Sequence, residues 1–317
     1  MNKNIIVLAF VFLVLISGLI FKTLNYDKSD NKELLFPSYE VLAKTSEIEI
    51  KNNSKKVILK LLENKWKVKN KDNFDADFEK VSDLIEKLQS INSIHSFAKT
   101  QNLLKDLELD PEDKTKKPTI VNFKDKNNNI IFQGFYGKER EKGGSYFLIS
   151  GNKKIHLSKN TIFIDPHPKT WVLNDLININ DEEITKVVVF DSKSKKVLEI
   201  KNLEEEFEVV YPENIKDFDK WKIKDFFNFP QSLDFNDIEK EKTNEKEIFR
   251  FEFYLETSGK IIISVLDKDK KLISIYTDET KDSKLNYDTK KNNYVFSILD
   301  YDFNMLLFSP EDLITED

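Results

Sequence analysis

Residues 54–66, SKKVILKLLENKW, set the pattern from which the fold is built. The segment Lys56–Leu62 is rich in Val, Ile and Leu, which is typical of a β-strand. A second strand pattern precedes it at Ile48–Lys51, and a third follows at Trp66–Val68. Three short strands so close together in the chain predict an antiparallel meander.

An amphipathic helix is expected after the meander. Its apolar positions share one helical face and are Phe78, Val81, Leu84, Ile85 and Leu88. A carboxylate just before a helix accepts hydrogen bonds from the free N–H groups of its first turn, and Asp75 or Asp77 is placed to do so. More strands of an antiparallel sheet, joined by the polar tips KDKNNN and GKEREKGG, are predicted at Thr119–Phe123, Ile130–Tyr136, Tyr146–Ile149 and Lys154–Leu157.

The same pattern runs a second time along the chain. The motif SKKV occupies 54–57 and 194–197, and Asp77-Phe78-Glu79-Lys80 has a counterpart in Asp217-Phe218-Asp219-Lys220 at the same separation, since 194 − 54 = 217 − 77 = 140. Other elements correspond in order: Glu47-Ile48 with Glu183-Ile184, Trp66 with Phe207, and Ile130-Ile131 with Ile261-Ile262. The second copy has a helix with Phe218, Trp221, Phe226 and Phe229, and strands at Phe249–Leu255, Lys260–Leu266 and Lys271–Tyr276. We therefore expect an internal duplication.

The expected fold class is α+β. An N-terminal transmembrane helix is followed by two similar units of antiparallel sheet and helix. The expected divisions are an anchor at 1–24, a linker at 25–46, a first repeat at 47–175 and a second repeat at 176–317.

The N-terminal run Ile5–Phe21, IIVLAFVFLVLISGLIF, is uncharged and close to the length that spans a bilayer. No small-x-small cleavage site follows it, which favours a retained anchor over a cleaved secretory peptide. With few residues before the run and nearly the whole chain after it, we expect a single-pass protein of the bacterial inner membrane with its body in the periplasm.

Composition excludes several classes of chemistry. The 50 basic residues are lysines except for Arg140 and Arg250, and the net charge is −6, which argues against nucleic-acid binding. The chain has no cysteine, so disulfides, thiolate nucleophiles and cysteine-ligated metals are excluded.

No residue set is assigned to catalysis, cofactor binding or metal binding. The three histidines, His95, His156 and His167, fall in different predicted elements, so only the fold could assemble them into a zinc site. The segment Asp165-Pro166-His167-Pro168 is expected to be a stiff connector between the repeats. The glycines Gly134, Gly137, Gly143 and Gly144 lack the lysine and helix start of a phosphate-binding loop, and no Gly-x-Ser-x-Gly elbow is present.

Aromatic residues are dense in the second predicted helix, and most are expected in the core. Phe227 is the one we expect to be exposed and available to a neighbouring protein.

The segments SEIEI, KKVILKLLENKW, ADFEKVSDLIEKLQSI and LELDPEDKTKKPTIVNF resemble the bacterial domain of unknown function 4340 family over nearly the whole body. Trp66, Ala76-Asp77, Pro111 and Tyr146 occupy family positions, whereas Glu108 stands where the family usually has glycine. The resemblance implies a membrane-anchored protein associated with ABC-type transport components of the gliding-motility auxiliary class. It brings no catalytic residues.

Two functional classes remain. The first is a non-enzymatic, membrane-anchored extracytoplasmic subunit that binds integral or peripheral membrane proteins, such as an ABC-type permease, in a transport or envelope complex. The alternative is an extracytoplasmic enzyme or small-ligand carrier.

Overall fold

A computed structural model describes residues 35–203, 206–213, 215, 217–240, 246–256, 259–278, 284–287, 294–307 and 309–313. Both sheets belong to one compact unit, Phe36–Asp317. The expected anchor, Ile5–Phe21, lies outside the described residues. Within the described ranges, no helix combines the length and the apolar character needed to cross a membrane.

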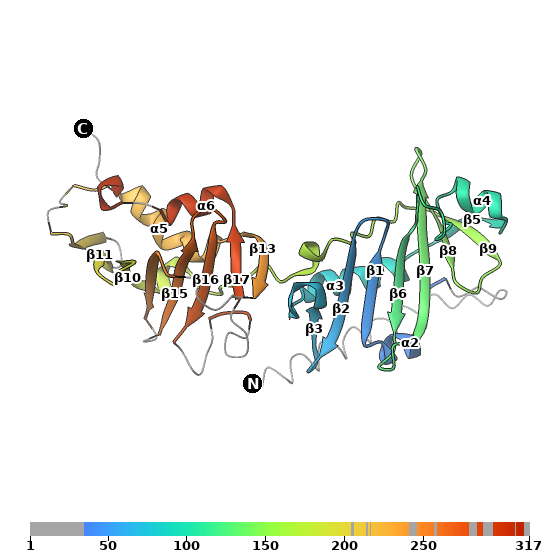
Figure 1. Ribbon diagram of the computed structural model, residues 1–317, viewed down its shortest axis with the longest axis horizontal. Helices are drawn as coiled ribbons and strands as arrows, with labels where there is room; N and C mark the ends of the chain where they lie inside the picture. Colours follow the sequence, from blue (N-terminus) through green and yellow to red (C-terminus); the bar gives the residue numbers. More distant parts are fainter. Residues whose placement is uncertain are drawn as a thin grey trace. The chain divides into compact units, whose positions relative to one another are not determined.

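The first sheet has nine antiparallel strands in the order β4-β3-β2-β1-β6-β7-β8-β9-β5 (Figure 1). Their bounds are β1 Glu47–Lys51, β2 Lys56–Leu62, β3 Lys65–Val68, β4 Phe74–Asp75, β5 Ser93–Ala98, β6 Thr119–Lys124, β7 Ile130–Glu139, β8 Ser145–Ile149 and β9 Lys154–Ser158. The predicted meander is confirmed as β1, β2 and β3, paired in that order. The edge strand β5 was not anticipated.

The second sheet has eight antiparallel strands in the order β12-β11-β10-β14-β15-β16-β17-β13. Their bounds are β10 Ile184–Asp191, β11 Lys196–Leu203, β12 Glu206–Tyr211, β13 Phe235–Lys240, β14 Phe249–Leu255, β15 Lys260–Asp267, β16 Leu272–Thr277 and β17 Tyr294–Ile298. The three strands predicted in this half are β14, β15 and β16.

The two sheets have the same topology once the two-residue strand β4 is set aside. The first three strands of each repeat form a meander at one end of its sheet. The next strand, β5 or β13, lies at the opposite edge, and the remaining four strands lie between. Strand β5 thus corresponds to β13, and β3 corresponds to β12. This match fits the internal repeat predicted from the sequence.

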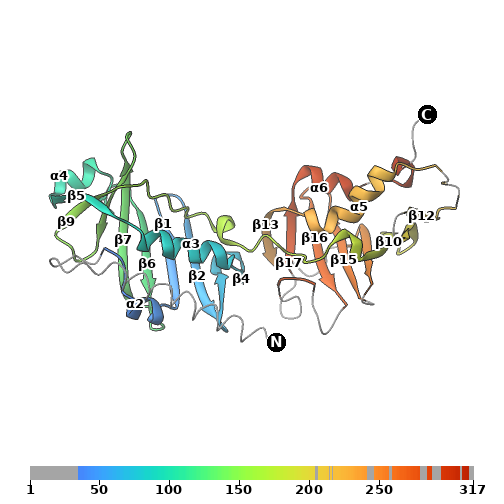
Figure 2. The same cartoon turned by 180° about the vertical axis from the view of Figure 1, so that it is seen from behind.

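A few helices accompany the sheets, so the protein is mostly β and only in part the α+β arrangement expected. They are α2 Tyr39–Lys44, α3 Phe78–Gln89, α4 Gln101–Asp106, α5 Lys220–Ser232 and α6 Asp300–Met305, with short 3-10 turns η1 Lys69–Lys71, η2 Pro168–Trp171, η3 Asp181–Glu183 and η4 Pro310–Leu313. Helix α3 lies across one face of the first sheet, and α5 lies across one face of the second (Figures 1 and 2). Helix α2 falls within the stretch expected to be a linker.

The two long helices begin in the same way. Asp77 accepts hydrogen bonds from the backbone of Glu79 and Lys80, and Asp219 accepts them from Trp221 and Lys222. These side chains satisfy N–H groups that have no partner inside the helix. The separation is 219 − 77 = 142, so the helix starts correspond at Asp219, two residues later than the sequence match at Asp217 implies.

Each helix buries an apolar face on its own sheet. In α3 the buried residues are Val81, Leu84 and Leu88, whereas Phe78 is 41% exposed and lies off the face predicted for it. In α5 the ring of Phe226 packs against Phe251 and Phe253 of β14, with centroids 5.7 and 6.2 Å apart. Burial of these apolar side chains, aliphatic in α3 and largely aromatic in α5, drives the packing of each helix on its sheet.

The connector between the repeats pairs with both. Backbone bonds join Asp77 N to Trp171 O and Leu173 N to Asp75 O on the first side. On the second side, Asn178 N bonds to Lys284 O at 2.7 Å. The connector is therefore an ordered, hydrogen-bonded segment.

Candidate functional site

The histidines singled out in the sequence have structural surroundings. His95 lies on β5, and His156 lies on β9 with its ring stacked on Phe147 and its Nδ1 3.1 Å from the hydroxyl of Ser93. His167 accepts a hydrogen bond from Lys169 N at the start of η2. Over the described ranges, no cluster of three or more His, Cys, Asp and Glu side chains is arranged to hold a metal ion.

Asp165 organises the proline-flanked connector. Its carboxylate accepts hydrogen bonds from His167 N at 2.8 Å and Thr170 Oγ1 at 2.6 Å, and its carbonyl accepts one from Trp171 Nε1 at 2.8 Å. The polar side chains of Asp165 and His167 thus find hydrogen-bond partners within the connector itself. Asp75, the other candidate cap, instead pairs with Lys67 at 2.7 Å.

The most heavily charged cluster of the first sheet surrounds Glu49 on β1. Its carboxylate lies within 3.0 Å of the ammonium groups of Lys51, Lys56 and Lys124, and it accepts a hydrogen bond from Asn122. Burial alone would raise the pKa of Glu49, but the hydrogen bonds from Lys56, Lys51 and Lys124 outweigh it and hold the pKa well below its usual range. The cluster is saturated internally, which is typical of a structural ion-pair network.

A comparable cluster lies on the second sheet at Glu252 of β14. Glu252 pairs with Lys260 at 2.8 Å and with Arg250 at 3.1 Å, and it accepts a hydrogen bond from the hydroxyl of Tyr254 at 2.8 Å. Burial and this bond to Glu252 raise the pKa of Tyr254 to about 12. Tyr254 is thus a neutral donor at physiological pH.

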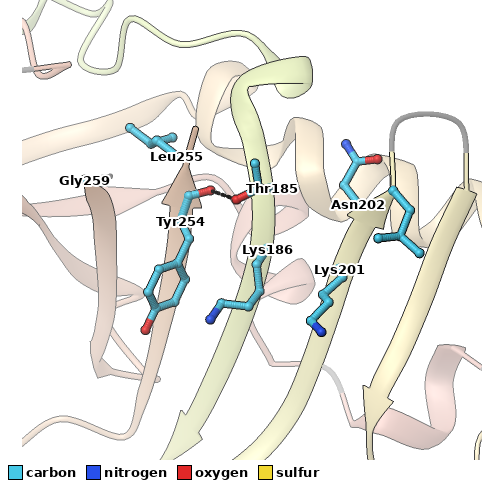
Figure 3. A pocket seen from close by; sticks show the side chains of 8 residues that line it. Thr185, Lys186, Lys201, Asn202, Tyr254, Leu255 and Gly259 are labelled. Atoms are coloured by element: carbon cyan, nitrogen blue, oxygen red, sulfur yellow. Dashed lines mark hydrogen bonds between the residues drawn. The ribbon is translucent and has the colours of Figure 1, made fainter. Parts of the chain in front are cut away.

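An open hollow of about 380 Å³ adjoins this cluster (Figure 3). The hydroxyl of Thr185 donates to the carbonyl of Tyr254 at its rim. Lys201 stands opposite Lys186 in the β10–β11 register, and Lys186 stands opposite Tyr254, with its ammonium 3.9 Å from the ring centroid. The hollow is a shallow cationic surface, and Lys186 is positioned in it by a cation–π contact with Tyr254.

The exposed aromatic residue of α5 is Trp221, and the expectation for Phe227 was wrong. Phe227 is 2% exposed because Phe207 of β12 covers it, with ring centroids 5.1 Å apart. Trp221 is 76% exposed. A signal was present in the sequence: Trp221 lies on the helical side opposite the buried residues Ile223, Phe226 and Phe227.

A second exposed surface is the outer edge of β5, whose six residues are all exposed. Ile94 is 44% exposed and Phe97 is 38% exposed. Among the described strands β5 pairs only with β9, so one side of its backbone has no strand partner. Sequence reasoning missed this strand because its apolar residues do not alternate regularly.

These features define a tandem-repeat β protein whose two carboxylate-centred clusters are internally paired and which exposes Trp221 on a helix and Ile94 and Phe97 on a sheet edge. The chain belongs to the family described as Domain of unknown function (DUF4340), whose sequence profile matches residues 66–249, more than half of the 317 residues. Neither the curated proteins nor the solved structures gave a match.

Proposed function

We propose that this chain is a non-enzymatic, membrane-anchored extracytoplasmic subunit that binds protein partners in an ABC-type transport or envelope complex. The observation that carries the proposal is the exposure of Trp221, which is 76% exposed on the first turn of α5. Tryptophan is among the residues that contribute most to binding energy in protein interfaces.

The surroundings of Trp221 suit an interface on a fixed support. Asp219 caps the helix and donates its own backbone N–H to the carbonyl of Leu313 at 2.8 Å. The opposite side of the helix is held in the core by Ile223 and Phe226. The indole is therefore presented on an anchored first turn, which lowers the conformational entropy lost on binding.

The apolar run Ile5–Phe21 supports the membrane part of the proposal. Confinement to the membrane surface would raise the effective concentration of the body near an integral partner, so an interface of modest area would be well occupied. Exposure of the body outside the cytoplasm is tested by protease treatment of spheroplasts. Loss of the body in intact spheroplasts is expected, and protection until the membrane is permeabilised would contradict the topology.

The binding test uses crosslinking and pull-down of the full chain from its native membranes. We expect partners to be recovered with the wild-type chain and recovery to fall about tenfold or more with Trp221→Ala. The matched control is Phe163→Ala, which removes another aromatic side chain that is 66% exposed. Equal recovery with all three chains, or recovery of the chain alone, would contradict the proposal.

A further inference from the structure

The outer edges of the two sheets are β4 and β5 in the first and β12 and β13 in the second. Strand β4 has only two residues, β12 carries Glu206 and Glu208, and β13 carries Asp237, Glu239 and Lys240. Shortness, and charge that the facing edge does not match with the opposite charge, are the usual devices that keep an edge from pairing with another strand. Strand β5, with the sequence SIHSFA, has six residues and no charge. Of these four edge strands it is the one without an Asp, Glu, Lys or Arg in the strand itself.

The surroundings of β5 are basic although the chain as a whole is acidic. No Asp or Glu occurs from Lys87 to Lys105 or from Lys142 to Ile164, the segments that supply β5, β9 and their turns. The exposed lysines at or next to the ends of β5 and β9 are Lys99, Lys153, Lys154 and Lys159. Within the part of the chain that the structure describes, these four form no ion pair.

The backbone of β5 can accept another strand. Lys99 N bonds to Lys153 O at 3.1 Å, so Lys99 faces β9. In an antiparallel ladder successive residues face alternate sides, and the backbone groups of Ala98 and Ser96 therefore point outward. The exposed side chains of Ile94 and Phe97 offer apolar area beside these groups.

Strand β12, an edge of the second sheet, has complementary properties. It also has six residues, Glu206–Tyr211. Glu206 and Glu208 are exposed and have no cationic partner in the described ranges, and Leu203 beside them is 54% exposed. Strand β12 is thus an acidic edge with one exposed apolar side chain beside it. It complements β5, which is an edge in basic surroundings with two exposed apolar side chains.

We propose that β5 of one chain pairs with β12 of a second copy, so that the first-repeat sheet of one molecule continues into the second-repeat sheet of the next. Charge selects this pairing. Two β5 edges would bring lysines together and two β12 edges would bring glutamates together, whereas β5 against β12 brings opposite charges together. Because the two surfaces differ, the association is head-to-tail, and it forms a ring or an open chain according to the rotation between neighbouring copies.

The equivalent ends of the repeats already meet inside the chain. Strand β13 is the counterpart of β5, and β3 is the counterpart of β12. Residues of β13 contact the turn that follows β3. Lys240 N donates to the carboxylate of Asp72 at 3.3 Å, and Lys71 forms an ion pair with Asp237. The proposed contact between two chains therefore uses the ends of the repeats whose counterparts already touch within a single chain.

Sedimentation velocity of the full-length chain over a wide concentration range tests the proposal. The wild-type chain is expected to form a concentration-dependent series of oligomers that recedes as salt is raised. Lys99→Glu with Lys154→Glu, and separately Glu206→Lys with Glu208→Lys, should each weaken association at least about tenfold. Mixing the two reversed chains should restore it, because each then presents the charge that the other lacks. The control is Lys55→Glu with Lys126→Glu, which makes the same charge change at the exposed tips of the β1–β2 and β6–β7 hairpins.

A wild-type chain that stays monomeric at every concentration would overturn the proposal, as would association that the reversals leave unchanged or that mixing does not restore. The absence of native cysteine permits a second measurement. Chains with Ala98→Cys and chains with Glu208→Cys should form a mixed disulfide dimer when combined and oxidised, and neither should dimerise alone. Homodimers of either chain in place of the mixed dimer would refute the head-to-tail pairing.

Discussion

The carboxylate of Glu49 lies 2.8 Å from the ammonium of Lys56, across the β1–β2 pair of the first sheet. Lys51 and Lys124 also pair with this carboxylate, so three cations surround it. Glu49 is buried, with 4% of the residue exposed. Removing the negative charge takes this partner from Lys51 and Lys56 and leaves Lys124 with Glu47 alone, and the loss of one member of a buried ion pair is strongly destabilising.

Glu49→Gln is therefore expected to lower the free energy of unfolding by about 2–3 kcal/mol, less than the ~3–5 typical of a fully buried pair because two of the lysines remain partly in water. Urea denaturation followed by circular dichroism measures this. Asp300→Asn is the control, since Asp300 pairs with Lys271 but its side chain is 80% exposed. A control loss above about 0.5 kcal/mol, or no loss at Glu49, would contradict the argument.

The same site predicts an acid dependence. The folded-state pKa of Glu49 lies below its unfolded value of 4.5, so its stabilisation is complete above that pH and is lost as pH falls through the folded pKa. The difference in unfolding free energy between wild-type and Glu49→Gln should be constant near neutral pH and shrink below pH 4.5. Denaturation midpoints measured over a pH series check this, and a difference that grows in acid would reverse the sign.

Phe74 of β4 packs against three aromatic rings of the second repeat. The centroids of Tyr294, Tyr287 and Phe296 lie 4.9, 5.4 and 5.9 Å away, and two of the contacts are edge to face. Phe74→Ala should lower the unfolding free energy by about 3–5 kcal/mol through lost burial and the cavity left behind. Phe163→Ala, at an exposed ring, should change it by less than about 0.5 kcal/mol. Equal effects would show that the cluster is not closely packed.

Two buried tyrosines form a matched pair for testing hydrogen bonding. The hydroxyl of Tyr287 donates to the carbonyl of Ile275 at 2.7 Å, whereas that of Tyr136 has no hydrogen-bond partner among the described residues. Burial raises the pKa of both phenols. Tyr287→Phe should cost about 1–2 kcal/mol, and Tyr136→Phe should cost nothing or stabilise the fold. Thermal unfolding of both variants decides this, and equal losses would contradict it.

Glu108 occupies the place where the resemblance to the family expects glycine, and its backbone shows why. It follows α4 with φ 57°, and the bonds Leu109 N to Leu104 O and Glu108 N to Lys105 O form a Schellman cap. Glu108→Gly should raise the unfolding free energy by about 0.5 kcal/mol, because relief of ~1–2 kcal/mol of left-handed strain exceeds the ~0.4–1 lost to chain entropy. Glu86→Gly inside α3 should instead cost about 1 kcal/mol. Destabilisation by both would refute the strain argument.

Local patterns predicted the elements that have a regular apolar face. Lys56–Leu62 was predicted with the bounds of β2, and Asp77 was one of two residues expected to cap α3. The edge strand β5 escaped because an exposed strand has no apolar alternation, and its pairing with β9 joins segments far apart in the chain. For the same reason, the surface at β5 could not be predicted.

The sequence by itself indicated the duplication, the family, the meander, two candidates for the cap of the first helix and the absence of thiol chemistry, because each depends on residue type and short spacing. Only the tertiary structure decided which charges are paired and which apolar side chains remain exposed. Phe227 is buried because Phe207 packs over it, and Trp221 is exposed because its helix turns the other side toward β14. Burial depends on what long-range packing brings against a residue, and local sequence does not specify that neighbour.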